Sequence, residues 1–423
     1  MTSSARPTTA PSASTSTTAR PGPLDGIVVC DLSRVLAGPY ATMLLADLGA
    51  TVIKVESAGG DDTRSWTPPE RDGEATYYLS INRNKRSMVL DFRDPDDVAV
   101  VHELFRRADV VVENFKVGGL AKFGLDYDAA KAINPALIYL SISGFGTAEG
   151  AGIPGYDLVV QAVSGLMSLT GEPDGPPYRA GISVFDVMTG LHGTIGLLAA
   201  LHHRDRTGEG QHVEVNLLSS ALSGLVNHSG AYAAAGVVPF RMGNAHPSVY
   251  PYQPMPTADR DVIVACGNDR QFAALCKVLE IPEIADDPRF ELNADRTDNR
   301  DELHPILLEA LSSWSADELF MTLNTAGVPC GPINTIAEGV ELAAKLGLDP
   351  VVAVGGSDSN TSDASSSGTS DAVEGSDAVE LIRNPITFSG ADVHYERRPP
   401  RLGEHTDELR SWLASPADSG ANP

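Results

Sequence analysis

Short apolar runs alternate with longer helical segments through the N-terminal part of the chain, and this alternation constrains the fold more than any other feature. The runs GIVVCDLS (26–33) and ATVIKVES (50–57) contain β-branched residues typical of strands, and PYATMLLADLG (39–49) between them has a helical pattern that ends at glycine. A strand, a helix and a strand of these lengths predict a βαβ unit with parallel strands. The pattern continues with SMVLDF, DVVVENF and LIYLSISGFG, separated by the helical segments DPDDVAVVHELFRRA and GLDYDAAKAINPA. We therefore predict an α/β fold whose large domain is an open, Rossmann-like parallel sheet.

The chain is long enough for a second domain, because 423 residues exceed the usual size of one core. We assign residues 23–224 to the large domain and 225–332 to a smaller α+β domain, where strands such as DVIVACG occur with helical segments such as DRQFAALCKVLEI. Residues 333–415 are expected to return to the large domain and to carry a low-complexity insertion at 355–380. The ends at 1–22, rich in Ser, Thr, Ala and Pro, and at 416–423 are expected to be disordered tails.

Charge and composition exclude several classes of partner. The net charge of −25 argues against nucleic acid and against an anionic membrane surface, although an anionic ligand needs only a local basic pocket. The four cysteines are far apart and form no CxxC pattern, so we predict neither a metal site nor a disulfide framework. The apolar run GLHGTIGLLAALHH is too short to span a membrane. We expect a cytoplasmic protein, with the mitochondrial matrix as the alternative if the N-terminal tail is a transit peptide.

One acidic residue, Asp186, stands in the otherwise uncharged segment GISVFDVMTG (181–190), just before an apolar helical run. Aspartate caps helix N-termini by accepting backbone N–H bonds, and a helix N-terminus also favours an ionised carboxylate that could act as a nucleophile. The two interpretations are compatible. The turn after the first strand, SRVLAGPYA, lacks the GxGxxG motif of dinucleotide-binding folds. A ligand at the carboxyl ends of the strands is therefore expected to bind by another chemistry.

Many motifs, in a common order, resemble the class III coenzyme A transferases of the CaiB/BaiF type, a family that also includes the α-methylacyl-CoA racemases. They include PLDGIVVCDLSRVLAGPYATMLLADLGATVIKVE, NRNKRSMVLD, VVENF, GYDLVVQAVSG, the Asp186 segment, GQHVEVNLL, AGVPCGPINT and RLGEHTDE, and they cover about residues 22–345 and 381–415. Within the family, DDTRSWTPP and ATYYLSINRNKRS look most similar to the succinyl-CoA:glutarate CoA-transferases. The resemblance implies transfer of CoA from an acyl-CoA donor, succinyl-CoA, to a carboxylic acid such as glutarate or mesaconate.

The resemblance also implies the residues of the site. Asp186 matches the nucleophile, which forms an aspartyl anhydride and then an enzyme–CoA thioester. Because an unperturbed aspartate has a pKa of roughly 4, we expect this carboxylate to be ionised at neutral pH. No permanently bound cofactor is implied, since CoA and acyl-CoA are substrates. The expected CoA-binding residues are Arg34, Val35, Leu36, Ala37, Leu90, Arg93, Asn114, Phe115, Lys122, Tyr156 and Asp157.

Two other functions stay open as alternatives. A racemase of this family would carry histidine in a Gly-His-Asp motif where this chain has Gly155, Tyr156 and Asp157. Tyrosine, with an unperturbed pKa near 10, is a poor base for an α-proton, which favours the transferase. A non-catalytic CoA-binding protein is the second alternative, and Asp186 with its glycine flanks counts against it.

The acceptor is expected to be a dicarboxylate. Arg64, Arg179 and Arg241 stand in motifs that match the glutarate-type enzymes, and an arginine fork suits a distal carboxylate. The resemblance further implies an interlocked homodimer, in which each chain threads through the other.

Overall fold

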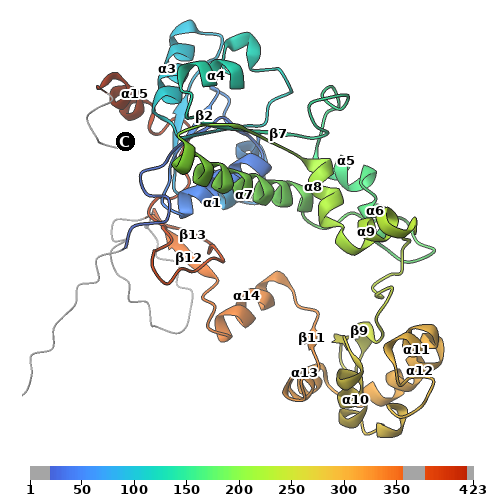
Figure 1. Cartoon of the computed structure of the whole chain (residues 1–423). Helices are drawn as coiled ribbons and strands as arrows, with labels where there is room; N and C mark the ends of the chain where they lie inside the picture. Colours follow the sequence, from blue (N-terminus) through green and yellow to red (C-terminus); the bar gives the residue numbers. More distant parts are fainter. Residues whose placement is uncertain (1–19, 356–376, 417–423) are drawn as a thin grey trace, which may run out of the picture.

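A six-stranded sheet forms the centre of the larger part of the molecule (Figure 1). The computed structural model describes residues 20–355 and 377–416. Every neighbouring pair in this sheet is parallel, in the order β5-β2-β1-β6-β7-β8. The predicted parallel α/β sheet is thus confirmed. Its strands are β1 (Val28–Asp31), β2 (Thr51–Glu56), β5 (Lys85–Val89), β6 (Val110–Glu113), β7 (Ile138–Ser143) and β8 (His212–Asn216).

Helices cover both faces of this sheet. On one face α1 (Ala37–Asp47), α7 (Val184–Thr207) and α8 (Leu217–Gly224) share a core with residues such as Val29 and Leu140. On the other face α3 (Pro95–Arg107), α4 (Tyr127–Ile133) and the C-terminal α15 (Thr406–Ala414) pack around residues such as Ile53. Figure 1 shows α3 and α4 above the sheet and α1 and α7 below it. Shorter elements complete this part of the chain: η1 (Asp62–Ser65), β3 (Glu70–Arg71), β4 (Glu74–Ala75), α2 (Thr76–Ile81), η2 (Ala121–Phe123), α5 (Asp157–Val163), α6 (Leu166–Leu169) and α9 (Val226–Ala235).

Helix α7 corrects one expectation from the sequence. The run GLHGTIGLLAALHH begins at Gly190, whereas the helix begins at Val184 and has 24 residues. By length and composition alone, this helix is long and apolar enough to cross a membrane. One side of the helix, including Leu197, Ala200 and Leu201, packs beneath the sheet. A helix buried on that side needs this apolar composition for the core itself.

A second, smaller core lies apart from the main sheet (Figure 1). An antiparallel sheet of β9 (Tyr252–Pro256), β10 (Asp261–Ala265) and β11 (Cys330–Pro332) supports it. The hydrophobic cluster of this core contains residues between Tyr250 and Cys330 of the sequence. Helix α9 falls within the expected small domain of 225–332, but it packs beside α8 of the larger part. The domain limits 23–224, 225–332 and 333–415 remain predictions. The helices around this core are α10 (Asp269–Val278), η3 (Pro282–Ile284), α11 (Asn293–Asp298), α12 (Arg300–Leu311) and α13 (Ala316–Thr325).

The C-terminal segment leads back to the main sheet through α14 (Ile336–Lys345). The strands β12 (Val351–Val354) and β13 (Val379–Ile382) pair antiparallel and pack against α2 in a small cluster of their own. Most of the insertion expected at 355–380 lies outside the described residues, and its last two residues belong to β13. The tails expected at 1–22 and 416–423 also fall almost wholly outside them.

Candidate active site

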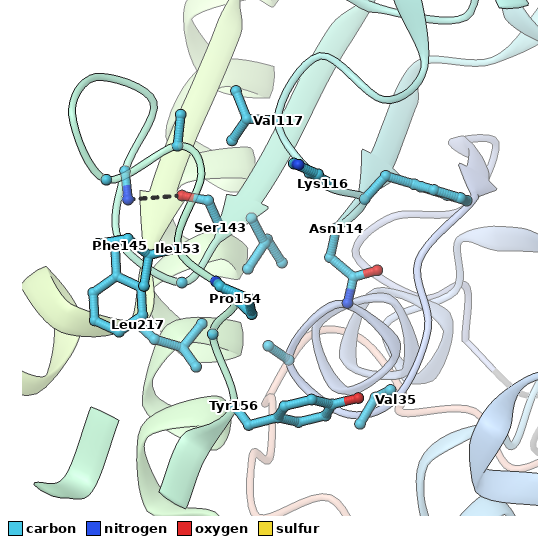
Figure 2. A pocket seen from close by; sticks show the side chains of 18 of the residues that line it. Val35, Asn114, Lys116, Val117, Ser143, Phe145, Ile153, Pro154, Tyr156 and Leu217 are labelled. Carbon is cyan, nitrogen blue, oxygen red and sulfur yellow. Dashed lines mark hydrogen bonds between the residues drawn. The ribbon is translucent and has the colours of Figure 1, made fainter. Parts of the chain in front are cut away.

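A cavity of about 340 Å³ opens at the carboxyl ends of β1, β6 and β7. This is the edge of a parallel sheet at which ligands are expected to bind. Three segments form its walls: residues 34–37 after β1, 114–117 after β6, and the stretch from 142, at the end of β7, to 156 (Figure 2). Asp186 and Leu217 close it on the side of α7 and α8.

The loop after β7 is rich in glycine because two of its segments approach each other closely. A Cβ on Gly144 would lie 2.6 Å from the Cα of Gly155, so no side chain fits at this contact. Gly146 donates its N–H to the Ser143 hydroxyl at 3.1 Å, a bond visible in Figure 2. The close contact leaves Pro154 and Tyr156 against the cavity.

Asp186 lies in the first turn of α7 but does not cap the helix. The N-cap position is Ser183, and the carboxylate that accepts the free backbone N–H groups is Asp157 at the start of α5. Its Oδ1 accepts from the N–H of Phe185 at 2.7 Å and of Asp186 at 3.1 Å. The capping interpretation of Asp186 is therefore wrong, since another residue fills that role and leaves the Asp186 side chain at the cavity wall.

The environment of Asp186 changes its acidity. Burial, and to a lesser extent the negative charge of Asp157, raise the pKa of Asp186 to about 7. The expectation of a fully ionised carboxylate at neutral pH is corrected accordingly. Near pH 7 a substantial fraction of the molecules carries a protonated Asp186.

Arg34, Asn114 and Phe115 come together at the mouth of the cavity. Arg34 donates its backbone N–H to Asn114 Oδ1 at 2.9 Å, and Asn114 Nδ2 donates to the Arg34 carbonyl at 2.6 Å. The Arg34 guanidinium lies over the Phe115 ring, 5.6 Å from its centroid, and pairs with Asp62 at 3.2 Å. Together with Val35, Ala37 and Tyr156, these residues account for the predicted CoA-binding residues that line the cavity.

Five predicted CoA-binding residues lie elsewhere. Leu36 and Leu90 are buried, and Leu90 belongs to the core on the α3 face of the sheet. The Arg93 side chain is 84% exposed and pairs with Asp91, whereas Lys122 lies over the ring of its neighbour Phe123. Asp157 is buried and caps α7 from outside the cavity lining.

The three candidate substrate arginines do not line the cavity either. Arg64 donates twice to Glu56, at 2.8 and 2.9 Å, and also to the Tyr78 hydroxyl and the Pro400 carbonyl. These bonds occupy its guanidinium, so the structure does not support Arg64 as a substrate residue. Arg179 is exposed and donates to the Ala180 carbonyl at 3.4 Å, and Arg241 donates to the Glu172 carbonyl at 3.2 Å.

Sequence reasoning missed Tyr77 on α2. Burial together with the charges of Asp186 and Asp157 raises the pKa of Tyr77. Trp66 meets its ring edge to face, with centroids 5.2 Å apart. The motif ATYYLSINRNKRS contains two adjacent tyrosines, and only the fold separates Tyr77, near Asp186, from Tyr78, which binds Arg64. The glycines of GFGTAEGAGIPG (144–155) were also missed, although glycine at this density signals a close backbone approach.

Comparison with known proteins gives consistent matches. The family model described as CoA-transferase family III matches residues 24–406. The chain is 45% identical over 402 residues to a succinate–glutarate CoA-transferase of Agrobacterium fabrum, covering 93% of this chain and 96% of that protein. It is 40% identical over 405 residues to an acetyl-CoA:oxalate CoA-transferase of Acetobacter aceti, covering 95% and 98%. The crystal structure of a CaiB/BaiF family protein from Brucella suis is similar with a TM-score of 0.79 and 43% identity, over 93% of this chain and 100% of that one.

Proposed function

Because this chain belongs to CoA-transferase family III and is therefore a CoA-transferase, we propose that it transfers CoA from succinyl-CoA to a dicarboxylate such as glutarate. The names of two relatives support a dicarboxylate acceptor, since glutarate and oxalate both carry two carboxylates. The observation that carries the proposal is the position of Asp186, a carboxylate free of the capping role and placed at the wall of the cavity.

The chemistry needs one carboxylate that attacks a thioester, is then attacked twice at its own carbonyl and is released at the end. Ionised Asp186 attacks the thioester carbonyl of succinyl-CoA, which forms a mixed anhydride and expels the CoA thiolate. The thiolate then attacks the Asp186 carbonyl, giving an aspartyl–CoA thioester and releasing succinate. The acceptor carboxylate attacks this thioester and forms a second anhydride with loss of the thiolate. Attack of the thiolate on the acceptor carbonyl gives the new CoA ester and restores the Asp186 carboxylate.

The cavity walls supply what these steps require. Asp157 fixes the first turn of α7 through two backbone N–H bonds, which holds Asp186 in one place for four successive attacks. Arg34 and Lys116 are the cations at the cavity, and we assign them to the anionic CoA. Val35, Ala37, Asn114, Phe115 and Tyr156 complete the proposed CoA site.

We also propose a homodimer, because the described part of the chain leaves an apolar face uncovered. Leu191 and Ile195 on α7 are 41% and 64% exposed, Val163 on α5 is 58% exposed, and Tyr232 on α9 is 64% exposed. A large contiguous patch of exposed apolar side chains marks a site of protein interaction. A second copy of the chain that covers this face would lie close to the cavity, because Tyr156 stands at the start of α5.

A direct assay tests the proposed reaction. Purified protein is incubated with succinyl-CoA and, separately, with glutarate, mesaconate, oxalate and valerate, and new CoA esters are identified by mass spectrometry. We expect glutaryl-CoA together with an equal amount of succinate. Absence of any new CoA ester would contradict the proposal. Exchange of the α-proton of a 2-methylacyl-CoA with solvent, without CoA transfer, would indicate the racemase instead.

A further inference from the structure

The loop that joins β1 to α1 is held by side chains at every backbone N–H from Ser33 to Val35. Ser33 donates to Asp31 Oδ1 at 3.0 Å, Arg34 to Asn114 Oδ1 at 2.9 Å, and Val35 to both carboxylate oxygens of Asp61 at 3.3 Å. A loop in which three consecutive backbone donors are taken in this way has little freedom to rearrange. Residues 34, 35 and 37 of the same loop line the cavity.

Val35 adopts a backbone conformation that valine normally avoids. Its φ is 69°, in the left-handed region that glycine and asparagine occupy readily and β-branched residues rarely do. Such a conformation persists only where surrounding contacts over-determine it. The bonds from the Val35 N–H to Asp61 are the contacts that act on this residue directly.

Asp61 is itself fixed in place by buried groups. Its Oδ2 accepts from Lys54 Nζ at 2.9 Å, and both side chains of this pair are fully buried. Lys54 Nζ also donates to the Ser33 carbonyl at 2.9 Å, so the same ammonium group reaches the loop directly. Oδ1 of Asp61 accepts from the Thr63 N–H and hydroxyl, at 3.0 and 2.8 Å. The carboxylate therefore has one orientation, with an edge toward the Val35 N–H.

We propose that Asp61 is a positioning residue for CoA, which holds the 33–37 loop in its binding conformation by keeping Val35 in the left-handed region. The inference rests on the proposed function, because it takes this cavity as the CoA site. Asp61 does not touch the ligand in this account: it acts through the backbone of Val35. The Lys54–Asp61 pair connects β2 to the loop after β1, so that two neighbouring strands determine the shape of one cavity wall.

The test measures CoA affinity by calorimetry in a cycle of variants. Asp61→Ala removes both acceptors of the Val35 N–H, and the dissociation constant for CoA should rise by about 10-fold because the binding conformation becomes a minor population. Val35→Gly alone measures the cost of losing the Val35 side chain from the cavity, since glycine adopts this φ without strain. The double variant Asp61→Ala/Val35→Gly should then bind CoA about as tightly as Val35→Gly does, because Asp61 is no longer needed to hold this φ. Asp72→Asn, which removes the same charge from an exposed turn in the next hairpin, should bind as the wild type does.

Each outcome decides between explanations. If Asp61→Ala binds CoA as the wild type does, or if the double variant binds CoA clearly more weakly than Val35→Gly does, the positioning role is wrong. If either result is found while the wild type still transfers CoA, the proposed function stands. A wild type that binds no CoA would contradict both the positioning role and the proposed function. If Asp61→Ala does not fold, Asp61→Asn takes its place. Lys54, Thr63 and Val35 must then compete for one oxygen, and a smaller loss with the same recovery by Val35→Gly is expected.

Discussion

In the proposed mechanism Asp186 reacts as a carboxylate, so the transferase activity should depend on pH. Burial and the charge of Asp157 raise its pKa to about 7, and only the ionised form can attack a thioester. We therefore predict that kcat/KM for succinyl-CoA falls as the pH is lowered through about 7, approaching a tenfold decrease per pH unit on the acid side. A pH–rate profile of the free enzyme measures this directly. A rate that stays constant from about pH 5 to pH 8 would mean that the carboxylate keeps an ordinary pKa near 4.

Arg179 and Arg241 remain the candidates for the distal carboxylate of the acceptor, because their side chains donate to backbone carbonyls rather than to the carboxylates that occupy Arg64. Loss of a charge-assisted pair costs about 2 to 3 kcal/mol, so glutarate should be preferred over valerate by roughly 30- to 150-fold in kcat/KM. Arg179→Gln or Arg241→Gln should reduce this preference, and Arg270→Gln on the exposed side of α10 should not. Equal rates with glutarate and valerate in the wild type would exclude a dicarboxylate-specific arginine.

At the residue scale, the sequence indicated which type of side chain occurs in the site better than it indicated the surroundings of that side chain. Asp186 could be proposed as a nucleophile from its motif, but its raised pKa depends on its burial and on the charge of Asp157, which lies 29 residues earlier. Arg64 could not be separated from the other arginines, because its partners Tyr78 and Pro400 are 14 and 336 residues away. Such partners are set by tertiary packing and leave no local pattern.

The first turn of helix α7 is capped by Asp157 at the start of α5, and this contact between two helices gives a prediction at the scale of elements. Asp157→Ala removes the acceptor of two N–H groups and should cost about 1 kcal/mol of stability. It also removes a negative charge beside Asp186, so the acid limb of the pH–rate profile should move to lower pH. Asp126→Ala, which removes the cap of α4 at Ala129, is the matched control. The control should lose similar stability without a shift of the profile, and a profile that stays in place in Asp157→Ala would contradict the account.

Elements were predictable where burial is continuous. Strands β1, β2, β6 and β7 are buried through most of their length and appear as largely apolar runs in the sequence. Strand β8 was not predicted, because it lies at the edge of the sheet and its sequence HVEVN alternates polar and apolar residues. The expected boundary at residue 225 falls between α8 and α9, two helices that pack together. The alternation of strands and helices in the sequence changes there, before the first residue of the second core.

At the scale of the whole molecule, the uncovered face of α5, α7 and α9 leads to a prediction about assembly. Light scattering should give the mass of two chains at low concentration, because a large apolar interface has no stable exposed counterpart. Ile195→Glu places a charge on the exposed side of α7 and should weaken the dimer, whereas Met321→Glu on the distant α13 should not. A wild-type protein with the mass of one chain would show that this face is not an interface between copies.

Oxygen labelling tests most directly whether Asp186 carries the transferred groups covalently. The enzyme is allowed to turn over unlabelled succinyl-CoA with glutarate whose carboxylates carry heavy oxygen. One glutarate oxygen bridges the second anhydride and stays on Asp186 when glutaryl-CoA is released. Mass spectrometry of the peptide that contains Asp186 should then show one heavy oxygen in its carboxylate after a single turnover and up to two after repeated turnovers, and the succinate of later turnovers should carry part of that label. Formation of glutaryl-CoA with an unlabelled Asp186 would contradict the account.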